Sequence, residues 1–259
     1  MPEAATPFDR WLAALEARHL GTLRFAEVSR ALRALSSAYV ERRNRLGHGA
    51  ALDGGGKRAA FALFYGPLHF LTAAHIVRHL PDLPRADTLV DLGCGTGAVG
   101  AALATSLTHI PRVVGIDRHQ WAIAEAAQTY EHFRLRAQMR REDAVRAAWP
   151  TRRTLLVAGW FANELDDDAR ARLLERLLRA QQHGASVLVI EPISRRLTPW
   201  WDGWADAVRQ RRGRADEWRF PADLPDLVRR LDRAAGLSHT ELTARSLWLP
   251  GSRPEPGPD

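Results

Sequence analysis

The stretch VDLGCGTGAVG, residues 90–100, decides the fold of this chain of 259 residues. A short β-rich run predicts a strand that ends at Leu92, and a helix is expected to begin near Ala98. Between them lie three glycines, Gly93, Gly95 and Gly97. Glycine permits positive φ and lets a ligand approach the backbone closely. The amides at the start of the helix can bind an anionic group. The stretch therefore predicts a ligand-binding turn between a strand and a helix.

Downstream of Pro84, short apolar runs alternate with helical patterns. Strands are expected at residues 88–92, 112–116, 137–141, 154–161 and 186–190. Helices are expected between them, at residues 98–107, 119–134 and 168–182. Such an alternation implies right-handed crossovers and a parallel sheet that is covered on both faces. The sequence therefore predicts an α/β fold with a Rossmann-like, doubly wound sheet.

Upstream of Pro84 the pattern is helical. Residues 7–46 repeat apolar side chains at the three- and four-residue spacing of one helix face. The glycine-rich residues 47–56 are expected to form a flexible loop, and residues 57–80 a long helix. Pro67 should kink or divide that helix, because proline lacks the amide proton and clashes with the preceding turn. These patterns divide the chain into a helical region at residues 1–82, an α/β domain at 83–250 and a disordered tail at 251–259.

At the C-terminal end, a helix is expected at residues 224–235, and residues 239–249 are the last stretch with β-forming character. No Gly, Pro or Asn divides that stretch, so we expect one continuous strand, or two very short ones, and a reduced sheet edge. Tryptophans are frequent just before this region, at Trp200, Trp201, Trp204 and Trp218. We expect the segment 199–218 to cover apolar surface at this edge, which would make it partly structural.

The charge balance makes RNA a candidate partner. Lys and Arg number 37 against 30 Asp and Glu, so the formal net charge is +7, and a basic surface attracts nucleic acid. The positive charge is nearly all arginine, however, with Lys57 the only lysine, and the arginines are spread along the chain among acids, so a bias in composition explains the charge equally well. Two alternatives also apply near the tryptophans. The aromatic rings and Arg211, Arg212 and Arg214 form either a pocket wall that binds phosphate or a packed cap with solvated arginines.

Cysteine and histidine usage argues against metal. Cys94 is the only cysteine, which excludes a disulfide framework and a cysteine-rich metal site. His75 and His79 have i, i+4 spacing, but no glutamate lies between them and no third ligand is apparent. We identify no apolar run long enough to span a bilayer and no signal-peptide pattern. The expectation is a soluble, cytoplasmic protein that binds neither metal nor membrane.

Over residues 80–192 the sequence resembles the class I S-adenosylmethionine-dependent methyltransferases. The resemblance rests on the unit D-x-G-x-G-x-G at residues 91–97 and on acids after the next two strands, Asp117 in VVGIDRHQWAI and Asp143 in REDA. It implies S-adenosylmethionine as cofactor and methyl transfer to an unidentified acceptor, either a small molecule or RNA. It also implies the sheet order 3-2-1-4-5, with one or two further edge strands.

The resemblance implies a role for each acid. Asp91 would face the methionine ammonium, Asp117 the ribose hydroxyls and Asp143 the adenine amino group. The backbone amide of Ala144 would face an adenine ring nitrogen. The remaining expected cofactor-binding residues are Gly93, Cys94, Gly95, Gly97, Arg118 and Gly159. Asp143 has an alternative role as a helix N-cap, because AVRAAW follows it.

Two other functions compete with this interpretation. Gly95, Gly97 and Gly100 also satisfy G-x-G-x-x-G, which makes a nicotinamide-dependent oxidoreductase an alternative. Asp91 disfavours it, because a carboxylate there repels a pyrophosphate. A faint similarity of FALFYGPLHFLTAAHIVRHLPDL to the methyltransferase-like proteins of the mitochondrial ribosomal small subunit implies a second alternative, a non-catalytic ribosome- or RNA-associated protein. That family carries a C-terminal cysteine cluster, which this sequence does not have.

Groups that act on an acceptor are expected beyond the carboxyl ends of the strands. No N/D-P-P-Y/F tetrapeptide follows the fourth strand, which disfavours an exocyclic adenine or glutamine nitrogen as the acceptor. A general base is needed only if the acceptor must lose a proton. The catalytic candidates are Trp160, Asn163 and Glu164, after the fourth strand, and Tyr65 and His69, on the helix before the glycine loop. For Tyr65 and His69 a core position is the alternative.

Overall fold

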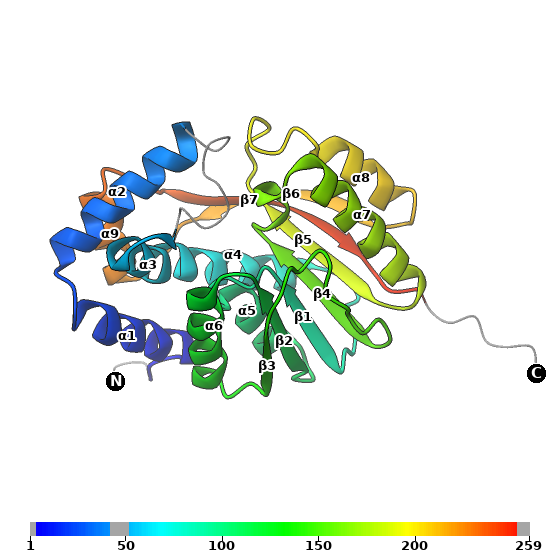
Figure 1. Ribbon diagram of the computed structural model, residues 1–259, viewed down its shortest axis with the longest axis horizontal. Helices are drawn as coiled ribbons and strands as arrows, with labels where there is room; N and C mark the ends of the chain where they lie inside the picture. Colours follow the sequence, from blue (N-terminus) through cyan, green and yellow to red (C-terminus); the bar gives the residue numbers. More distant parts are fainter. Residues whose placement is uncertain (1–3, 42–51, 253–259) are drawn as a thin grey trace, which may run out of the picture. The chain divides into compact units, whose positions relative to one another are not determined.

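The computed structural model describes residues 4–41 and 52–252, which form two compact units (Figure 1). The helical unit comprises the residues up to His69 together with Pro221–Leu242, and the sheet unit comprises Phe70–Phe220 and the residues from Thr243 onward. The division falls within helix α4 (Gly66–His79), upstream of the boundary expected between residues 82 and 83. The second part of α4 therefore belongs with the sheet, and the segment after Phe220 with the N-terminal helices.

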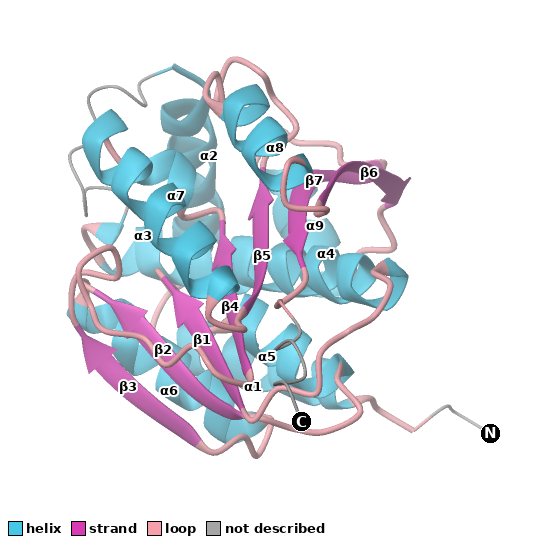
Figure 2. Cartoon of the chain, turned by 90° about the vertical axis from the view of Figure 1, so that its right-hand side faces the viewer, coloured by secondary structure: helices cyan, strands magenta, loops and turns pink. Residues whose placement is uncertain are grey.

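Seven strands of the described residues form one sheet, in the order β3-β2-β1-β4-β5-β7-β6 (Figure 2). Their bounds are β1 Thr88–Leu92, β2 Arg112–Asp117, β3 Ala137–Arg141, β4 Thr154–Gly159, β5 Ser186–Glu191, β6 Arg214–Pro221 and β7 Glu241–Leu249. The first five are parallel, and β7 runs antiparallel to β5. The predicted fold class is confirmed, and so are the five predicted parallel strands.

Helices cover both faces of this sheet. The predicted crossover helices are α5 (Ala98–Ser106), α6 (Gln120–His132) and α7 (Asp167–Gln182), and α8 (Trp201–Arg209) follows β5. Leu173 and Leu177 of α7 and Trp204 of α8 pack in one apolar core with alternate strand residues such as Val90 and Leu92. Asp91 points to the opposite face, because successive side chains of a strand alternate. Its partners there lie on α5 and α6.

The C-terminal edge differs from the prediction in one respect. Residues 241–249 form a single continuous strand, as predicted, but the edge is not reduced, because β6 completes it. The sequence of β6, RADEWRFP, carries charged residues at half of its positions, and all of its residues are exposed or half-buried. Edge strands are commonly charged in this way, which limits pairing with other chains. The same charges hide the apolar alternation by which a strand is recognised.

The tryptophans before β7 have structural roles, although the end of the predicted cover, residues 214–218, forms part of the edge strand β6 itself. Trp201 and Trp204 are each 5% exposed and belong to the apolar core under α8. Trp200 packs against that core, with its ring centroid 4.7 Å from that of Trp204. Trp218 of β6 donates from Nε1 to Ser246 Oγ of β7 at 2.8 Å. The tryptophans therefore join α8 and β6 to the rest of the sheet unit.

The helical unit contains α1 (Pro7–Leu20), α2 (Phe25–Glu41), α3 (Gly55–Ala60), a π-helical turn (Phe61–Tyr65) and α9 (Asp226–Ala234). The π turn comes directly before Pro67, and Gly66 N donates to Phe61 O. A wider turn at this point accommodates the proline ring, so the expected disturbance takes the form of a π turn. The predicted loop at residues 47–56 is only partly described, and Gly55 already begins α3. The predicted tail lies outside the described residues from 253 onward.

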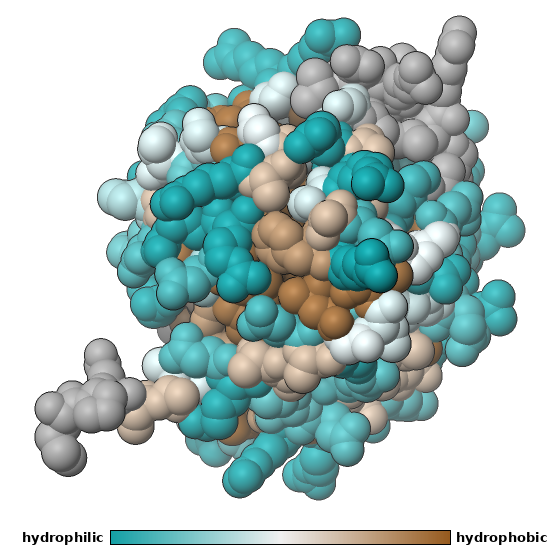
Figure 3. Space-filling model, turned by 90° about the vertical axis from the view of Figure 1, so that its left-hand side faces the viewer, coloured by the Kyte–Doolittle hydropathy of each residue, from teal (hydrophilic) through white to brown (hydrophobic). Residues whose placement is uncertain are grey.

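The expectation about apolar length needs a correction. The continuous helical run Gly55–His79 is 25 residues long, with a mean hydropathy of 1.4 over its most apolar window, and is long and apolar enough to cross a membrane. Within the protein, however, 72% of that window is buried, and this burial accounts for its composition. The face of the molecule in Figure 3 shows apolar side chains gathered at its centre and hydrophilic ones around them.

Candidate functional site

The loop after β1 has a backbone that only glycine adopts without strain. Gly93, Gly95 and Gly97 have φ values of +65°, +52° and +75°. A Cβ on Gly93 would overlap the ring of Phe161. Both the close packing and the positive φ therefore require glycine at this position. Gly97 precedes α5, and its amide donates to Cys94 O at 2.7 Å. The loop is therefore a tight turn that exposes backbone at the carboxyl edge of the sheet.

Asp91, in the strand before this loop, holds the loop to the neighbouring helices. It is 1% exposed, and its Oδ2 accepts hydrogen bonds from Gly100 N at 3.0 Å and from Tyr130 Oη at 2.8 Å. Burial raises the pKa of Asp91 from its usual 3.8 to about 7, against the lowering effect of these two hydrogen bonds. A Cβ on Gly100 would lie 2.5 Å from Oδ2, so the carboxylate explains the glycine at that position. Asp91 thus joins β1 to α5 and α6, and its expected contact with a ligand ammonium stays a prediction.

Asp117 links the loops that follow β1 and β2. Its Oδ2 accepts from Gly95 N at 3.0 Å, and its Oδ1 accepts from His119 N at 2.8 Å. Each carboxylate oxygen keeps a second lone pair, because an ionised carboxylate offers about four acceptor sites. Asp117 is half-buried, and the side chain of Arg118 beside it is exposed. The geometry leaves Asp117 able to accept further hydrogen bonds from a ligand hydroxyl.

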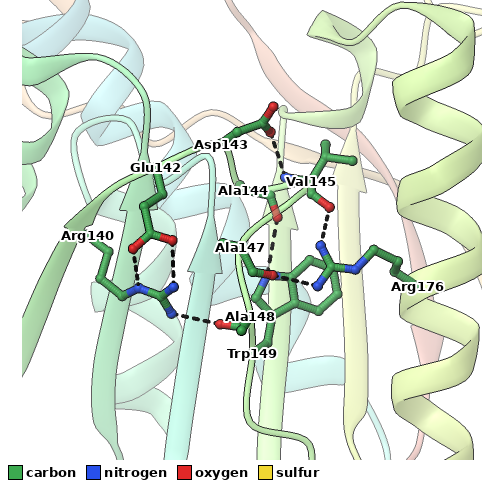
Figure 4. A network of polar contacts seen from close by, with 9 residues as sticks. All are labelled: Arg140, Glu142, Asp143, Ala144, Val145, Ala147, Ala148, Trp149 and Arg176. Carbon is green, nitrogen blue, oxygen red and sulfur yellow. Dashed lines mark hydrogen bonds and ion pairs between the residues drawn. The ribbon is translucent and has the colours of Figure 1, made fainter.

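Asp143 begins a loop that two arginines hold in place (Figure 4). Arg140 of β3 forms two hydrogen bonds with Glu142, of 3.0 and 2.6 Å, and a third with Ala148 O at 2.7 Å. Arg176 of α7 donates to the carbonyl oxygens of Val145 and Ala147. Its guanidinium also stacks 3.9 Å from the centre of the Trp149 ring. The segment after β3 is therefore fixed along most of its length.

Within this loop, Asp143 Oδ1 accepts from Val145 N at 2.9 Å, and Oδ2 lies 3.8 Å from Arg146 Nε. The residues that follow form turns and no α-helix, so Asp143 caps a turn where a helix was the alternative expectation. Ala144 is buried, and its carbonyl accepts from Trp149 Nε1 at 3.2 Å. The loop after β3 thus supplies an acid at the same sheet edge as Asp91 and Asp117, since parallel strands end together.

The segment after β4 is strained at Trp160. This residue has φ of +53°, which a bulky side chain rarely adopts, and its amide donates to Ile190 O at 2.7 Å. Such strain is concentrated at functional sites. Gly159, just before it, is packed so closely that a Cβ would lie 2.8 Å from Val99 Cγ2. The strained residue and the tight glycine put the start of this segment directly beside the glycine loop.

Asn163 is held by a residue that the sequence did not single out. Glu191, the last residue of β5, is fully buried and accepts from Asn163 N at 3.2 Å and from Asn163 Nδ2. Asn163 is 9% exposed, whereas Glu164 is exposed. Glu191 sits in the apolar run SVLVIE, and an acid at the end of a buried strand was the available signal. The amide of Asn163 therefore has a positioning contact within the protein.

Tyr65 and His69 belong to the helical unit. Tyr65 Oη lies 3.3 Å from Ser36 Oγ, and the Tyr65 and His69 rings are 6.2 Å apart. Burial lowers the pKa of His69 to about 3, so this histidine is neutral at physiological pH. Both side chains are half-buried, and a role in catalysis for either residue stays a prediction. Among the described residues, no group of three His, Cys, Asp or Glu side chains could hold a metal ion.

Comparison with known proteins identifies the domain. Residues 89–184 match the family model described as a methyltransferase domain. The chain contains a methyltransferase domain over these residues. The match confirms the predicted superfamily, whose cofactor is S-adenosylmethionine. The match covers the strands and loops that carry Asp91, Asp117 and Asp143, and it favours the methyltransferase interpretation of the glycine loop over the dinucleotide one.

Individual relatives are more distant. A segment of 54 residues is 41% identical to ribosomal RNA large subunit methyltransferase G of Streptomyces avermitilis, and covers 21% of this chain and 14% of that protein. A Listeria monocytogenes structure assigned to the class I S-adenosylmethionine-dependent methyltransferases has a TM-score of 0.52 at 11% identity, over 98% of this chain and 88% of that one. The mitomycin 7-O-methyltransferase MmcR also has a TM-score of 0.52, at 16% identity, over 95% and 73%. At such identities the two structures support the fold alone.

Proposed function

We propose that this chain transfers a methyl group from S-adenosylmethionine to an acceptor bound beyond the carboxyl ends of β4 and β5. The main support for the proposal is that three loops follow neighbouring parallel strands at one edge of the sheet. The glycine loop after β1 is bonded to the loop after β2 through Asp117, and Asp143 follows β3 at the same edge. Acids after three successive parallel strands fit a ligand that carries an ammonium, a ribose and an adenine.

The residues present fit the cofactor. Positive φ at Gly93, Gly95 and Gly97 turns backbone toward the edge without a Cβ in the way. Asp117 would hold the ribose hydroxyls, while Asp143 and the Ala144 amide would hold the adenine. Asp91 would face the ammonium, because a cation beside the buried carboxyl would favour its ionised form. Cys94, Arg118 and Gly159 complete the proposed cofactor-binding set.

When bound, S-adenosylmethionine supplies an electrophilic methyl group on a sulfonium. The protein's task is to orient the acceptor and exclude water. Trp160 and Phe161 offer aromatic surface for this, and the Glu191 contact to Asn163 holds their segment in place. Glu164 is exposed and would take a proton only from an acceptor that must lose one. We therefore propose that Asn163 positions the segment after β4 and that Glu164 takes the proton from an acceptor that must lose one.

The acceptor is proposed at the level of two classes, RNA and small molecules. The net charge of +7 favours RNA, and the curated relative matched over 54 residues is named for methylation of ribosomal RNA. The test incubates the full chain with methyl-tritiated S-adenosylmethionine and either total RNA or a small-molecule extract. We expect label in one of the two fractions, and none with a Gly93→Ala variant. Label in neither fraction, although the cofactor binds, would favour the non-catalytic RNA-associated alternative.

A further inference from the structure

A second polar cluster lies at the carboxyl edge of the sheet unit, around Arg245 of β7. Arg245 is the register partner of Glu191, the residue that ends β5 and holds Asn163. It therefore lies at the edge where the β4 segment and the glycine loop also lie. Ligands of open α/β sheets bind beyond this edge. Arg245 thus lies beside the region in which the acceptor is proposed to bind.

The guanidinium of Arg245 is buried, and one of its hydrogen-bond donors has no partner among the described residues. The residue is 3% exposed. Nη2 donates to Glu217 Oε1 at 3.1 Å, Nη1 donates to Thr198 Oγ1 at 3.5 Å, and the group lies 5.4 Å from the centre of the Trp201 ring. Nε has no hydrogen-bond partner in the described part of the chain. A buried cation with an unused donor is unfavourable unless a ligand completes it.

A second buried donor without a partner belongs to the segment that Arg245 contacts. Within residues 4–41 and 52–252, Trp200 Nε1 and Arg245 Nε are the two buried side-chain atoms that lack a hydrogen bond. Trp200 lies in the segment 198–201, which Arg245 contacts at Thr198 and Trp201, and the rings of Trp200 and Trp201 are 5.9 Å apart. Both atoms are donors. A group that completes either donor must therefore accept hydrogen bonds, and the positive charge of Arg245 favours an anion at that residue.

We propose that Arg245 binds an acidic group of the methyl acceptor, a carboxylate or a phosphate; this inference rests on the proposed function. The Nε and Nη2 hydrogens lie along one side of a guanidinium and match two oxygens of such a group. Glu217 of β6 now contacts Nη2, and its side chain is 54% exposed. Glu217 is therefore the contact that an incoming acid replaces. Until then it holds the guanidinium in its binding position.

The test measures anion binding to the full chain by tryptophan fluorescence, since the Trp201 ring lies against the guanidinium. The probes are acetate and inorganic phosphate, with sodium chloride keeping the ionic strength constant. Glu217→Gln removes the competing carboxylate and leaves Arg245 in place. We expect its half-saturating anion concentration to fall about two- to fivefold, as expected for loss of a partly exposed ion pair. Arg245→Met should abolish the response.

Asp206→Asn is the matched control, because it removes an exposed carboxylate paired with Arg209 at 3.0 Å on α8. A response to acetate alone supports a carboxylic acid acceptor, and a response to phosphate alone supports a phosphate-bearing one. No response in any variant, or equal responses in Glu217→Gln and Asp206→Asn, would overturn the proposal. If Arg245→Met does not fold, these two variants decide. Calorimetric binding of S-adenosylhomocysteine is measured on the same samples, so failure of the cofactor site is recognised separately.

Discussion

The two halves of the sheet's carboxyl edge satisfy their charged groups by different means. In the half built from β1, β2 and β3, each of the three carboxylates accepts from backbone amides: Gly100 for Asp91, which Tyr130 Oη also contacts, Gly95 and His119 for Asp117, and Val145 for Asp143. In the half built from β4, β5, β6 and β7, the charged groups also pair with other side chains. Asn163 Nδ2 donates to Glu191, Arg245 donates to Glu217, and two buried donors have no partner among the described residues.

This difference suits two kinds of ligand, one that is the same throughout the family and one that varies between its members. Backbone amides keep their places whatever side chains surround them, so the first half is organised before any ligand arrives. Side-chain pairs can exchange partners, and an unused buried donor is a position that a ligand can complete. We infer that the first half serves the cofactor, and that the second half gives the enzyme its choice of acceptor.

The largest expected effect comes from the backbone of the first half. Gly93→Ala places a Cβ in the Phe161 ring and at a φ of +65°. A left-handed residue costs about 1–2 kcal/mol and overpacking about 1–3 kcal/mol, so we expect a loss of about 2–5 kcal/mol in unfolding free energy. Gly203→Ala is the control, because nothing lies within 4 Å of its added Cβ in α8, and it should stabilise slightly. Equal urea midpoints for the two variants would contradict the tight packing described for the loop.

The next effect concerns Asp117. Loss of a charge-assisted hydrogen bond costs roughly 1.5–3 kcal/mol, so Asp117→Ala should weaken S-adenosylhomocysteine binding about ten- to a hundredfold. Asp87→Ala, which removes an exposed carboxylate paired with Arg153, should leave the affinity unchanged. Isothermal titration of both variants measures the difference. An unaltered affinity in folded Asp117→Ala would mean that the ribose is held elsewhere.

The pH profile sharpens the role of Asp91. Its folded pKa of about 7 lies above the usual 3.8, so the native state holds this proton more tightly than the unfolded chain. The resulting stability is fully present below about pH 4 and is lost as the pH rises toward 7. A cofactor ammonium needs the ionised form, so affinity for S-adenosylhomocysteine should rise between about pH 6 and 8. Asp91→Asn should flatten both profiles, and an unchanged affinity profile in this variant would assign Asp91 to loop anchoring alone.

The smallest expected effect lies in the turn between α8 and β6. If RNA is the acceptor, binding should weaken as salt rises, and a triple change of Arg211, Arg212 and Arg214 to Ala should flatten that dependence. The effect is limited because Arg214 already forms two hydrogen bonds of 2.7 Å with Asp216. The control is the same change at exposed arginines toward the opposite sheet edge, namely Arg112, Arg134 and Arg136. Absence of RNA binding at low salt would favour a small-molecule acceptor.

The same division explains what the sequence could predict. The loop of residues 90–100 and the acids at Asp117 and Asp143 are local patterns, because each follows its own strand. Strand β6 was not predicted, because the charged residues typical of an exposed edge strand interrupt its apolar pattern. The pairing of Glu191 with Asn163, and of Arg245 with Glu217, joins residues 28 apart in each case. No periodicity connects such residues, and only the folded sheet brings them together.

The identity of the cofactor is tested most directly by a calorimetric titration of the full chain with S-adenosylhomocysteine and, separately, with NAD. The arrangement of Asp91, Asp117 and Asp143 around the glycine loop predicts saturable binding of S-adenosylhomocysteine and no binding of NAD. Binding of NAD without any response to S-adenosylhomocysteine would contradict the account.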